Sequence, residues 1–546
     1  MASLPDVLGV TGAGTMGAGI AQVLAVAGAT TLLHDPDPVA LERALQRVAR
    51  DLRRRAQRGR MRSPEAEAAI ARVRLAPRLD DLAPAALIVE AAPEDRELKR
   101  DLLRELSQRA PGAVLASNTS SIPITDLATA ASDPSRVVGL HFFNPAPAMK
   151  LVELVAGLDS APEALALARA VAEAGGKRVV EAADGPGFLV NRCNRPFSLE
   201  AFGLLQERAA EVATIDRVVR LGGGFPMGPF ELADLVGLDV GLQVARSFHE
   251  LSFGEPRWRP SPLVARMVAA GRLGRKSGRG WYAYGEREGG GTAPHRPADE
   301  PAPRPGGGDG RLVVVAGDRV VAGELLERAA GAGFDVRAPH DAEGEVPWLV
   351  LDGGADPEDP PAQGGPVALL LADGSLAALD SGGGAVGFHL LPPLETCGLV
   401  ELTRGAGTAP VAAERADELF AALGLRRAWV GDGPGLVLGR IVAQLVNEAA
   451  FAVGEGVGSP ADVDDGMVLG LNHPRGPLLW GDLIGLDHVL AVLDALWEER
   501  REERFRAAPL LRRLVLQGDL GVHTGAGFHD HEDRDADLTP GAPRSS

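Results

Sequence analysis

The segment Gly12-Ala13-Gly14-Thr15-Met16-Gly17 follows the apolar run DVLGV and opens an apolar helical pattern that reaches Ala27. In such a loop the first glycine permits a tight turn, the second lets the backbone approach a pyrophosphate, and the third allows close helix packing. The amides and dipole at the helix start favour phosphate charge. A purely structural turn is the alternative, but the flanking strand and helix patterns favour a dinucleotide-binding loop.

Asp35 ends the next apolar run, eighteen residues after Gly17. A carboxylate there accepts hydrogen bonds from the adenosine ribose and repels a 2′-phosphate, and Leu33, His34 and Pro36 offer no compensating cation. The sequence therefore predicts NAD rather than NADP as the cofactor. The residues expected to bind it in this region are Gly12, Gly14, Thr15, Met16, Gly17 and Asp35.

Around this loop, residues 1 to about 180 alternate apolar strand patterns with amphipathic helical patterns. This alternation predicts a parallel sheet with helices on both faces, a Rossmann domain over residues 1–185. The pattern then becomes helical, which predicts an all-α domain over residues 186–285. The segment EREGGGTAPHRPADEPAPRPGGGDG, residues 286–310, is rich in Gly, Pro and charge and is expected to be a linker.

The second half of the chain repeats the first at an offset of 248 residues. Asp184-Gly-Pro-Gly matches Asp432-Gly-Pro-Gly, and Val236-Gly-Leu-Asp matches Ile484-Gly-Leu-Asp. The repeat predicts a degenerate Rossmann-like domain over residues 311–425, a second all-α domain over 426–531 and a tail at 532–546. The loop VVVAGDRVVAG keeps one glycine near the turn and places Asp318 close to where a pyrophosphate would lie. This copy is therefore predicted not to bind a dinucleotide.

Length and composition set further limits. A chain of 546 residues exceeds one hydrophobic core, so several domains are expected, and the net charge of −18 argues against sequence-independent nucleic-acid binding. Nine arginines between residues 43 and 62 form either a solvated helix face or a region that attracts a polyanionic ligand.

Cys193 and Cys397 stand alone, so neither a disulfide framework nor a metal site is expected. The N-terminal residues and hydropathy predict a soluble, cytoplasmic protein that does not enter a membrane.

The chemistry that the sequence indicates centres on a histidine and a carboxylate. Oxidation of an alcohol needs a base that takes the hydroxyl proton while hydride leaves for the nicotinamide. His141, in the segment HFFNP, and Glu153 can supply a histidine held by a carboxylate, which suits this role near neutral pH. From spacing alone, a core histidine that pairs with Glu153 only for packing remains the alternative.

Together with the segments SNTSS (117–121) and GPGFLVN (185–191), these residues resemble the 3-hydroxyacyl-CoA dehydrogenase family over residues 5 to 285. The resemblance implies that His141 is the catalytic base and that Glu153 orients and polarises it. It also implies that Ser120 and Asn191 hydrogen-bond the reacting oxygen of the substrate.

The same resemblance assigns residues around the nicotinamide and the substrate. It places Glu94 and Lys99 close to the nicotinamide end of the cofactor. Asn144 falls in a substrate-lining motif, although capping of the turn before Pro145 is an equally good explanation for it.

The resemblance implies reversible, NAD-dependent oxidation of an (S)-3-hydroxyacyl-CoA to the 3-oxoacyl-CoA, within fatty-acid β-oxidation or phenylacetate catabolism. The acyl group would be short or dicarboxylic, such as 3-hydroxybutyryl or 3-hydroxyadipyl, but the sequence does not specify its length. Two alternatives stay open. One is a free hydroxy-acid or sugar-acid dehydrogenase on the same fold, and the other is a noncatalytic NAD-binding scaffold.

The tandem arrangement is similar to bacterial long-form members of the family, including those of phenylacetate degradation, whose shorter relatives dimerise through their helical domains. It implies that the two helical domains pack on each other within one chain, and the assembled protein could still be a homo-oligomer.

The second copy serves as an internal control, because features kept in both copies can be purely architectural. Gly439 stands where the first copy has Asn191, yet His389 and Glu401 keep the twelve-residue His-to-Glu spacing. Ser375 could replace the first copy's serine, although it lies fourteen rather than twenty-one residues before its histidine. The second site is interpreted as a remnant.

Overall fold

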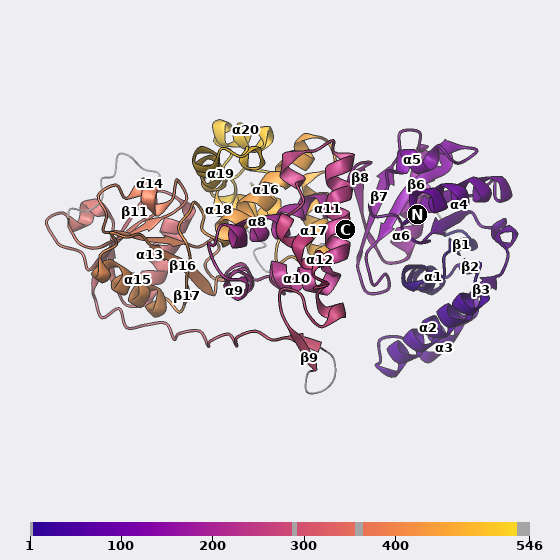
Figure 1. Ribbon diagram of the computed structural model, residues 1–546, viewed down its shortest axis with the longest axis horizontal. Coiled ribbons are helices and arrows are strands. Elements are labelled where there is room, and N and C mark those ends of the chain that lie inside the picture. Colours follow the sequence, from indigo (N-terminus) through magenta and orange to yellow (C-terminus); the bar gives the residue numbers. More distant parts are fainter. Residues whose placement is uncertain (1–3, 287–291, 355–363, 532–546) are drawn as a thin grey trace. The chain divides into compact units, whose positions relative to one another are not determined.

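The computed structural model describes residues 4–286, 292–354 and 364–531, so the expected tail lies outside the described residues. The chain divides into two compact units. Unit 1 comprises Met1–Arg192 with Glu455–Leu471, and unit 2 comprises Cys193–Gly454 with Asn472–Ser546. Unit 1 contains one eight-stranded sheet, and unit 2 contains a seven-stranded sheet and a two-stranded sheet, each unit with accompanying helices (Figure 1). Within the expected linker, β10 (Thr292–Pro294) pairs antiparallel with β9 (Tyr284–Glu286).

The sheet of unit 1 has eight strands in the order β3-β2-β1-β4-β5-β6-β7-β8. Strand order reverses beside β1, and ligands of such sheets bind at this switch point, beyond the carboxyl ends of the strands. The expected Rossmann fold is confirmed. The strands are β1 (Val7–Thr11), β2 (Thr30–His34), β3 (Val73–Ala76), β4 (Leu87–Glu90), β5 (Val114–Ser117), β6 (Val137–Phe142), β7 (Leu151–Ala156) and β8 (Arg178–Ala183).

One strand pair departs from the expected parallel sheet: β7 runs antiparallel to β6. Only residues 143–150 join these strands, whereas a parallel crossover needs about a dozen residues or more. The chain therefore turns straight back, and the register places His141 directly opposite Glu153.

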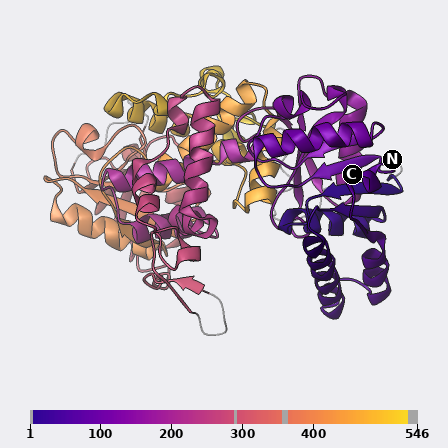
Figure 2. The same cartoon turned by 45° about the vertical axis from the view of Figure 1, so that its right-hand side comes forward.

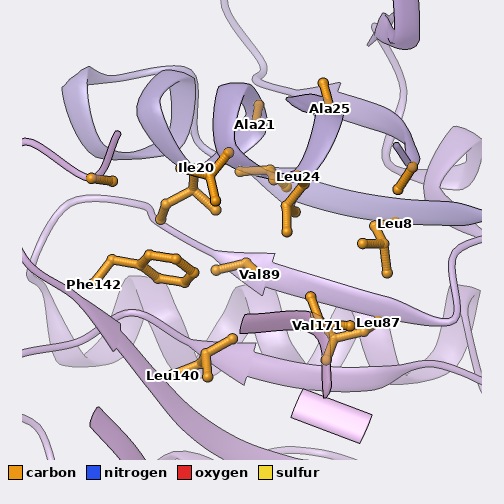
Figure 3. Packing of buried hydrophobic residues seen from close by; sticks show 14 of the residues in the cluster. Leu8, Ile20, Ala21, Leu24, Ala25, Leu87, Val89, Leu140, Phe142 and Val171 are labelled. Carbon is orange, nitrogen blue, oxygen red and sulfur yellow. The ribbon is translucent and has the colours of Figure 1, made fainter. Parts of the chain in front are cut away.

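Helices cover this sheet and build its core. Ile20 and Leu24 of α1 are one helical turn apart and fully buried, and Figure 3 shows them above Val89 and Phe142 of the sheet. Helices α2 and α3 form a hairpin that projects from the rest of the unit (Figure 2). The helices are α1 (Thr15–Ala27), α2 (Pro38–Gln57), α3 (Ser63–Arg72), α4 (Arg96–Arg109), α5 (Ile124–Ala128), α6 (Pro162–Ala174), α7 (Val190–Cys193) and α17 (Pro460–Leu471).

The sheet of unit 2 has the order β12-β11-β13-β14-β15-β16-β17, which repeats that of unit 1 without a counterpart of β3. Between β12 and β13, where every residue is described, the chain forms no helical hairpin like α2–α3, which explains the shorter second α/β segment. Strands β15 and β16 are again antiparallel, with His389 opposite Glu401. The strands are β11 (Leu312–Ala316), β12 (Asp335–Arg337), β13 (Leu349–Asp352), β14 (Val367–Leu370), β15 (Val386–His389), β16 (Leu399–Arg404) and β17 (Arg426–Trp429).

Helices from both repeats share unit 2, where α8 packs on α16. The helices are α8 (Arg195–Gln206), α9 (Val212–Gly223), α10 (Pro229–Val236), α11 (Leu238–Leu251), α12 (Pro262–Ala269), α13 (Val320–Gly331), α14 (Leu376–Leu379), α15 (Pro410–Ala422), α16 (Leu438–Gly454), α18 (Pro477–Ile484), α19 (Leu486–Arg500) and α20 (Pro509–Gln517).

One helix of each repeat lies on the sheet of the other repeat. Helix α17 comes from the second repeat but packs on β7 and β8 of unit 1, where Asp465 bonds Arg178 at 2.7 Å. Helix α9 comes from the first repeat and packs on β16 of unit 2. The expected second helical segment is thus shared between the two compact units.

Ion pairs between the repeats are reciprocal. Arg440 donates to Glu207 at 2.7 and 2.8 Å, and Arg192, 248 residues earlier, donates to Glu455, 248 residues after Glu207, at 2.8 Å. Such i-to-j and j-to-i contacts are the signature of a two-fold symmetric interface. Segments of the two repeats therefore contact each other inside each compact unit.

No helix in the described ranges is long and apolar enough to cross a bilayer.

The pairing of the repeats predicts a large stability effect at Arg440. Arg440 is 2% exposed and also bonds Glu200, which is 3% exposed, at 2.8 Å. Arg440→Met should lower the unfolding free energy by about 3 kcal/mol, because it removes one of the two cations, Arg440 and Arg504, that bond the buried Glu200 carboxylate. Arg512→Met, which breaks a surface pair with Asp494, should cost less than about 1 kcal/mol. Equal shifts of the thermal unfolding midpoint in the two variants would contradict this interpretation.

Candidate functional site

The candidate residues of the first copy gather at one edge of the unit 1 sheet. Strand register places Glu90, Ser117 and Gly139 side by side near the carboxyl ends of β4, β5 and β6. Ser120 follows β5 by three residues, and His141 lies two residues beyond Gly139. The sheet therefore brings the phosphate loop, the serine segment and the histidine to its ligand-binding edge.

His141 and Glu153 form a buried pair. His141 Nδ1 lies 2.7 Å from Glu153 Oε2, and the two residues are 7% and 0% exposed. The other carboxylate oxygen, Oε1, accepts the backbone amides of Leu189 and Val190 at 3.0 and 2.8 Å. The bond at Nδ1 fixes the ring and leaves Nε2 for a substrate. The structure therefore brings together the two residues whose spacing suggested a base and its carboxylate.

Aromatic rings border the histidine. The Phe143 ring centre lies 4.7 Å from that of His141, and the Phe188 ring centre lies 6.1 Å away. Both phenylalanines are buried, which lowers the local dielectric and strengthens electrostatic interactions at the imidazole.

Glu94 organises the serine segment. Its Oε1 accepts Thr119 Oγ1 at 2.7 Å, the Ser120 amide at 3.0 Å and Ser121 Oγ at 2.9 Å. Burial would raise the pKa of Glu94, but Lys99 and these donors together hold it below its usual value. An ionised Glu94 thus fixes the loop that carries Ser120.

Lys99 is fully enclosed, at 1% exposure, and donates to Glu90 Oε1 at 2.7 Å. It lies 3.4 Å from Glu94 Oε2. Ser117 Oγ donates to the other oxygen of Glu90 at 2.6 Å. Glu90 was not among the expected site residues, although an acidic residue that ends a buried apolar strand was a usable signal. It is the buried counter-ion that makes the position of Lys99 possible.

The glycines of the phosphate loop have three different environments. Gly12 has φ +96°, and a Cβ there would lie 2.6 Å from the Ala91 carbonyl oxygen. A Cβ on Gly17 would lie 1.7 Å from the Gly12 carbonyl oxygen, whereas a Cβ on Gly14 would meet nothing within 4 Å. Open space at the second glycine and close backbone contact at the third fit a dinucleotide pyrophosphate at the start of α1.

Asp35 accepts a hydrogen bond from the backbone of this loop. Its Oδ2 accepts the Ala13 amide at 2.7 Å, and its Oδ1 accepts the Asp37 amide at 3.0 Å. The carboxylate is partly exposed beside the loop. Its position is the one from which an adenosine ribose is bound in Rossmann folds.

The two asparagines lie in different surroundings. Asn144 is exposed, on the loop between β6 and β7. Asn191 is half-buried in the first turn of α7, next to Val190, whose amide bonds Glu153. The Glu153 carboxylate therefore links the position of Asn191 to that of His141.

Comparison with known proteins decides the family. The NAD-binding domain of 3-hydroxyacyl-CoA dehydrogenase matches residues 7–185, and the C-terminal domain of the same family matches residues 187–284 and 435–531. The chain belongs to the 3-hydroxyacyl-CoA dehydrogenase family. The function expected from the sequence is thereby confirmed as that of an NAD-dependent 3-hydroxyacyl-CoA dehydrogenase.

Two relatives span the whole tandem arrangement. The chain is 36% identical to the 3-hydroxyadipyl-CoA dehydrogenase of Escherichia coli K12, over 93% of this chain and 97% of the relative. A crystal structure of 3-hydroxybutyryl-CoA dehydrogenase from Escherichia coli K12 superposes with a TM-score of 0.79 and 32% identity, over 94% of this chain and 98% of that one. The 3-hydroxybutyryl-CoA dehydrogenase of Mycobacterium tuberculosis matches one half, with 42% identity over 51% of this chain and 98% of its own length.

In the second copy of the dehydrogenase architecture, the histidine has left its carboxylate. His389 Nε2 lies 3.1 Å from His488 Nε2, and the Glu401 oxygens accept the amides of Val437 and Leu438 instead. A Cβ on Gly439 would lie 2.1 Å from His389 Cε1, so the asparagine of an intact family site cannot occupy this position beside the turned ring.

An arginine stands in the second copy's phosphate loop. Gly317, with φ +97°, corresponds to the first glycine of the intact loop, and Arg319 takes the position of the second. Arg319 is 5% exposed and bonds Asp373 at 2.7 Å and Asp487 at 3.3 Å. Asp318, which we expected near the pyrophosphate position, is exposed, so the buried residue that alters this loop is Arg319.

Ser375 does not replace Ser120. Its side chain caps α14. The next amide, that of Leu376, bonds Asp432 at 2.7 Å, as the Ile124 amide bonds Asp184 at 2.8 Å in the first copy. Ser375 therefore corresponds to the residue just before Ile124. The matching aspartates also show that the shared Asp-Gly-Pro-Gly segment has an architectural role.

The phosphate-loop geometry predicts that Gly14→Val blocks the cofactor without disturbing the fold. The new side chain would enter open space at the predicted pyrophosphate position, so the Kd for NADH should rise at least tenfold, by about 1.4 kcal/mol or more. Fluorescence titration with NADH measures this. Gly112→Val is the control, because Gly112 is exposed, also has open space and lies away from the loop. Unchanged NADH affinity in the Gly14 variant would contradict the assignment.

The buried histidine pair of the second copy predicts that the folded protein loses stability in acid. Burial, with Arg319 nearby, lowers the pKa of His389 to about 3, and burial beside His389 lowers that of His488. Both are neutral when folded, whereas histidines of the unfolded chain protonate near pH 6.5. The unfolded state then binds more protons, so stability should fall as the pH drops from about 7 toward 3.

Thermal unfolding midpoints measured across this pH range test the histidine pair. The double variant His389→Leu/His488→Val should lose less stability on acidification than the unmodified chain. Burial raises the pKa of Glu401 to about 8, but Glu401 is present in both proteins and its titration is common to them. Parallel pH profiles would show that the pair does not carry the acid sensitivity.

Proposed function

We propose that the first copy oxidises the 3-hydroxyl group of an acyl-CoA with His141 as general base. The supporting observation is the buried bond from His141 Nδ1 to Glu153, which leaves Nε2 to accept the hydroxyl proton. NAD, when bound, takes up the hydride from C3 of the substrate. The C3–H and O–H bonds break, a C=O bond forms, and the proton stays on His141.

Glu153 acts on this step in two ways. Its negative charge stabilises the imidazolium that forms, and its backbone bonds keep the carboxylate from turning away. Ser120 and Asn191 are proposed to hydrogen-bond the reacting oxygen, and Asn144 to line the substrate site. Glu94 and Lys99 would hold the serine segment beside the nicotinamide, and Asp35 would bind the ribose.

The acyl group is proposed to be short or dicarboxylic. The full-length relatives carry the names 3-hydroxyadipyl-CoA and 3-hydroxybutyryl-CoA dehydrogenase, and the half-length relative the second of these names. We also propose a cytoplasmic enzyme, because neither Cys193 nor Cys397 forms a disulfide, as a reducing compartment favours.

The direct test follows NADH oxidation with acetoacetyl-CoA, with NADPH and free acetoacetate in parallel. Turnover is expected only with NADH and the thioester. A longer or dicarboxylic 3-oxoacyl-CoA series then defines the acyl group. Turnover of free acetoacetate would favour a hydroxy-acid dehydrogenase.

The role of His141 predicts a selective loss of activity. His141→Gln should lower kcat by about 10²- to 10⁴-fold, the usual contribution of a general base, while the Kd for NADH stays within twofold. His389→Gln is the matched control from the second copy and should leave kcat within about twofold. If the two variants lost activity equally, the assignment of chemistry to the first copy would be wrong.

A further inference from the structure

Unit 2 contains a pocket of about 530 Å³ between segments of the two repeats. It is bounded by α8, by the loop between α11 and α12, and by the end of α19 with the segment that follows it. Ligand pockets commonly measure about 300–1,000 Å³. The phosphate loop, His141 and Glu153 belong to unit 1 and do not line this pocket, so it is separate from the residues proposed for the dehydrogenase reaction.

The two repeats supply equivalent ion pairs around this pocket. Arg504 bonds Glu200 at 3.1 Å, and Arg257 bonds Glu448 at 2.9 Å. Glu448 lies 248 residues after Glu200, and Arg504 lies 247 residues after Arg257. Helices α12 and α20, which follow these arginines, also start 247 residues apart. The two sets of contacts are therefore related by the internal two-fold symmetry of the repeats.

This symmetry breaks at one helical position, where α16 carries Phe451 and α8 carries Gly203, 248 residues earlier. The Phe451 ring contacts two guanidinium groups. Its centre lies 4.0 Å from Arg257 Cζ and 5.0 Å from Arg506 Cζ. Guanidinium groups are attracted to the face of an aromatic ring, so the second repeat fills this place with a ring held by two cations.

The equivalent arginines near α8 are Arg504 and Arg259, and both line the pocket together with Gly203. A Cβ on Gly203 would lie 3.1 Å from Arg504 Nη1, so the guanidinium faces the place where a side chain is missing. The Phe505 ring centre lies 4.4 Å from Arg504 Cζ, and the Trp258 ring contacts the equivalent arginine at 5.3 Å. The pocket thus repeats the two cations and the neighbouring ring of the second site, but glycine supplies no ring between α8 and the cations.

Arg259 also needs a counter-ion. Its side chain is exposed and has no ion-pair partner within residues 4–286, 292–354 and 364–531, whereas the equivalent Arg506 lies 3.5 Å from Glu503. The pocket contains acidic residues, but each of them already forms an ion pair with another arginine; they are Glu200, Glu207, Glu502 and Glu503. An acid group on a ligand would therefore pair with Arg259 through charge-assisted hydrogen bonds.

We propose that this pocket binds a small aromatic acid, with the ring against Arg504 and the acid group on Arg259. The ring takes the place that Phe451 fills in the second repeat. Because that repeat supplies its own ring, one ligand per chain is expected. This site is additional to those for NAD and the acyl-CoA and uses none of their residues.

Calorimetric titration of the full-length protein with 2-naphthoate tests the site. Saturating NADH is present throughout, so that the dinucleotide loop is occupied. The comparison ligand is decahydro-2-naphthoate, which has the same carbon skeleton and charge but no aromatic face. We expect one 2-naphthoate per chain, bound about tenfold more tightly than the saturated acid, because only the aromatic ring attracts the guanidinium groups.

Two variants connect this binding to the pocket. Gly203→Phe should abolish it, because it places on α8 the ring that α16 already carries. The atoms nearest to the new Cβ are the ends of two arginine side chains, at 3.1 and 3.3 Å, which have only to shift by a few tenths of an ångström. The kcat with acetoacetyl-CoA should stay within twofold and serves as the check that this variant folds. Arg259→Gln should weaken 2-naphthoate binding about tenfold, whereas Arg266→Gln, an exposed control on α12 outside the pocket, should leave it unchanged.

Three results would overturn the inference. They are no binding of 2-naphthoate by the unmodified protein at millimolar concentration, equal affinity for the aromatic and the saturated acid, and unchanged binding in Arg259→Gln. If Gly203→Phe failed to fold, the comparison of Arg259→Gln with Arg266→Gln would still decide. None of these results bears on the proposed dehydrogenase reaction, which is measured separately.

Discussion

The buried carboxylate of Glu153 connects the site to the fold. A carboxylate at 0% exposure needs several hydrogen-bond donors. One oxygen of Glu153 bonds the His141 ring, and the other accepts two backbone amides. Those amides belong to the segment that leaves the sheet and starts α7. One side chain therefore orients the histidine and fixes where the chain leaves the sheet for the helices.

The second copy separates these two roles. Glu401 keeps both backbone amides, of Val437 and Leu438, but His389 no longer bonds it. The twelve-residue spacing thus persists because the carboxylate still anchors the next helix, independently of any chemistry. The second copy also carries Arg319 in its phosphate loop, and its buried His389 bonds the buried His488 instead of Glu401.

Much of this site could be predicted from local sequence. The phosphate loop follows from its glycines between a strand and a helix, and the pairing of His141 with Glu153 follows from a connection too short for a crossover. Arg319, His488 and α17 could not be assigned roles in this way. Arg319 bonds Asp487 across 168 residues, His488 bonds His389 across 99, and α17 packs on strands of the other repeat. Such contacts depend on the tertiary fold, and no local pattern encodes them.

We conclude that a duplicated chain holds one working dinucleotide site. The stoichiometry of NADH binding, measured by isothermal titration calorimetry on the full-length protein, tests it most directly. One NADH per chain is the result that the open Gly14 loop and the buried Arg319 predict. Two equivalents per chain would show that the second loop still binds the cofactor and would overturn this conclusion.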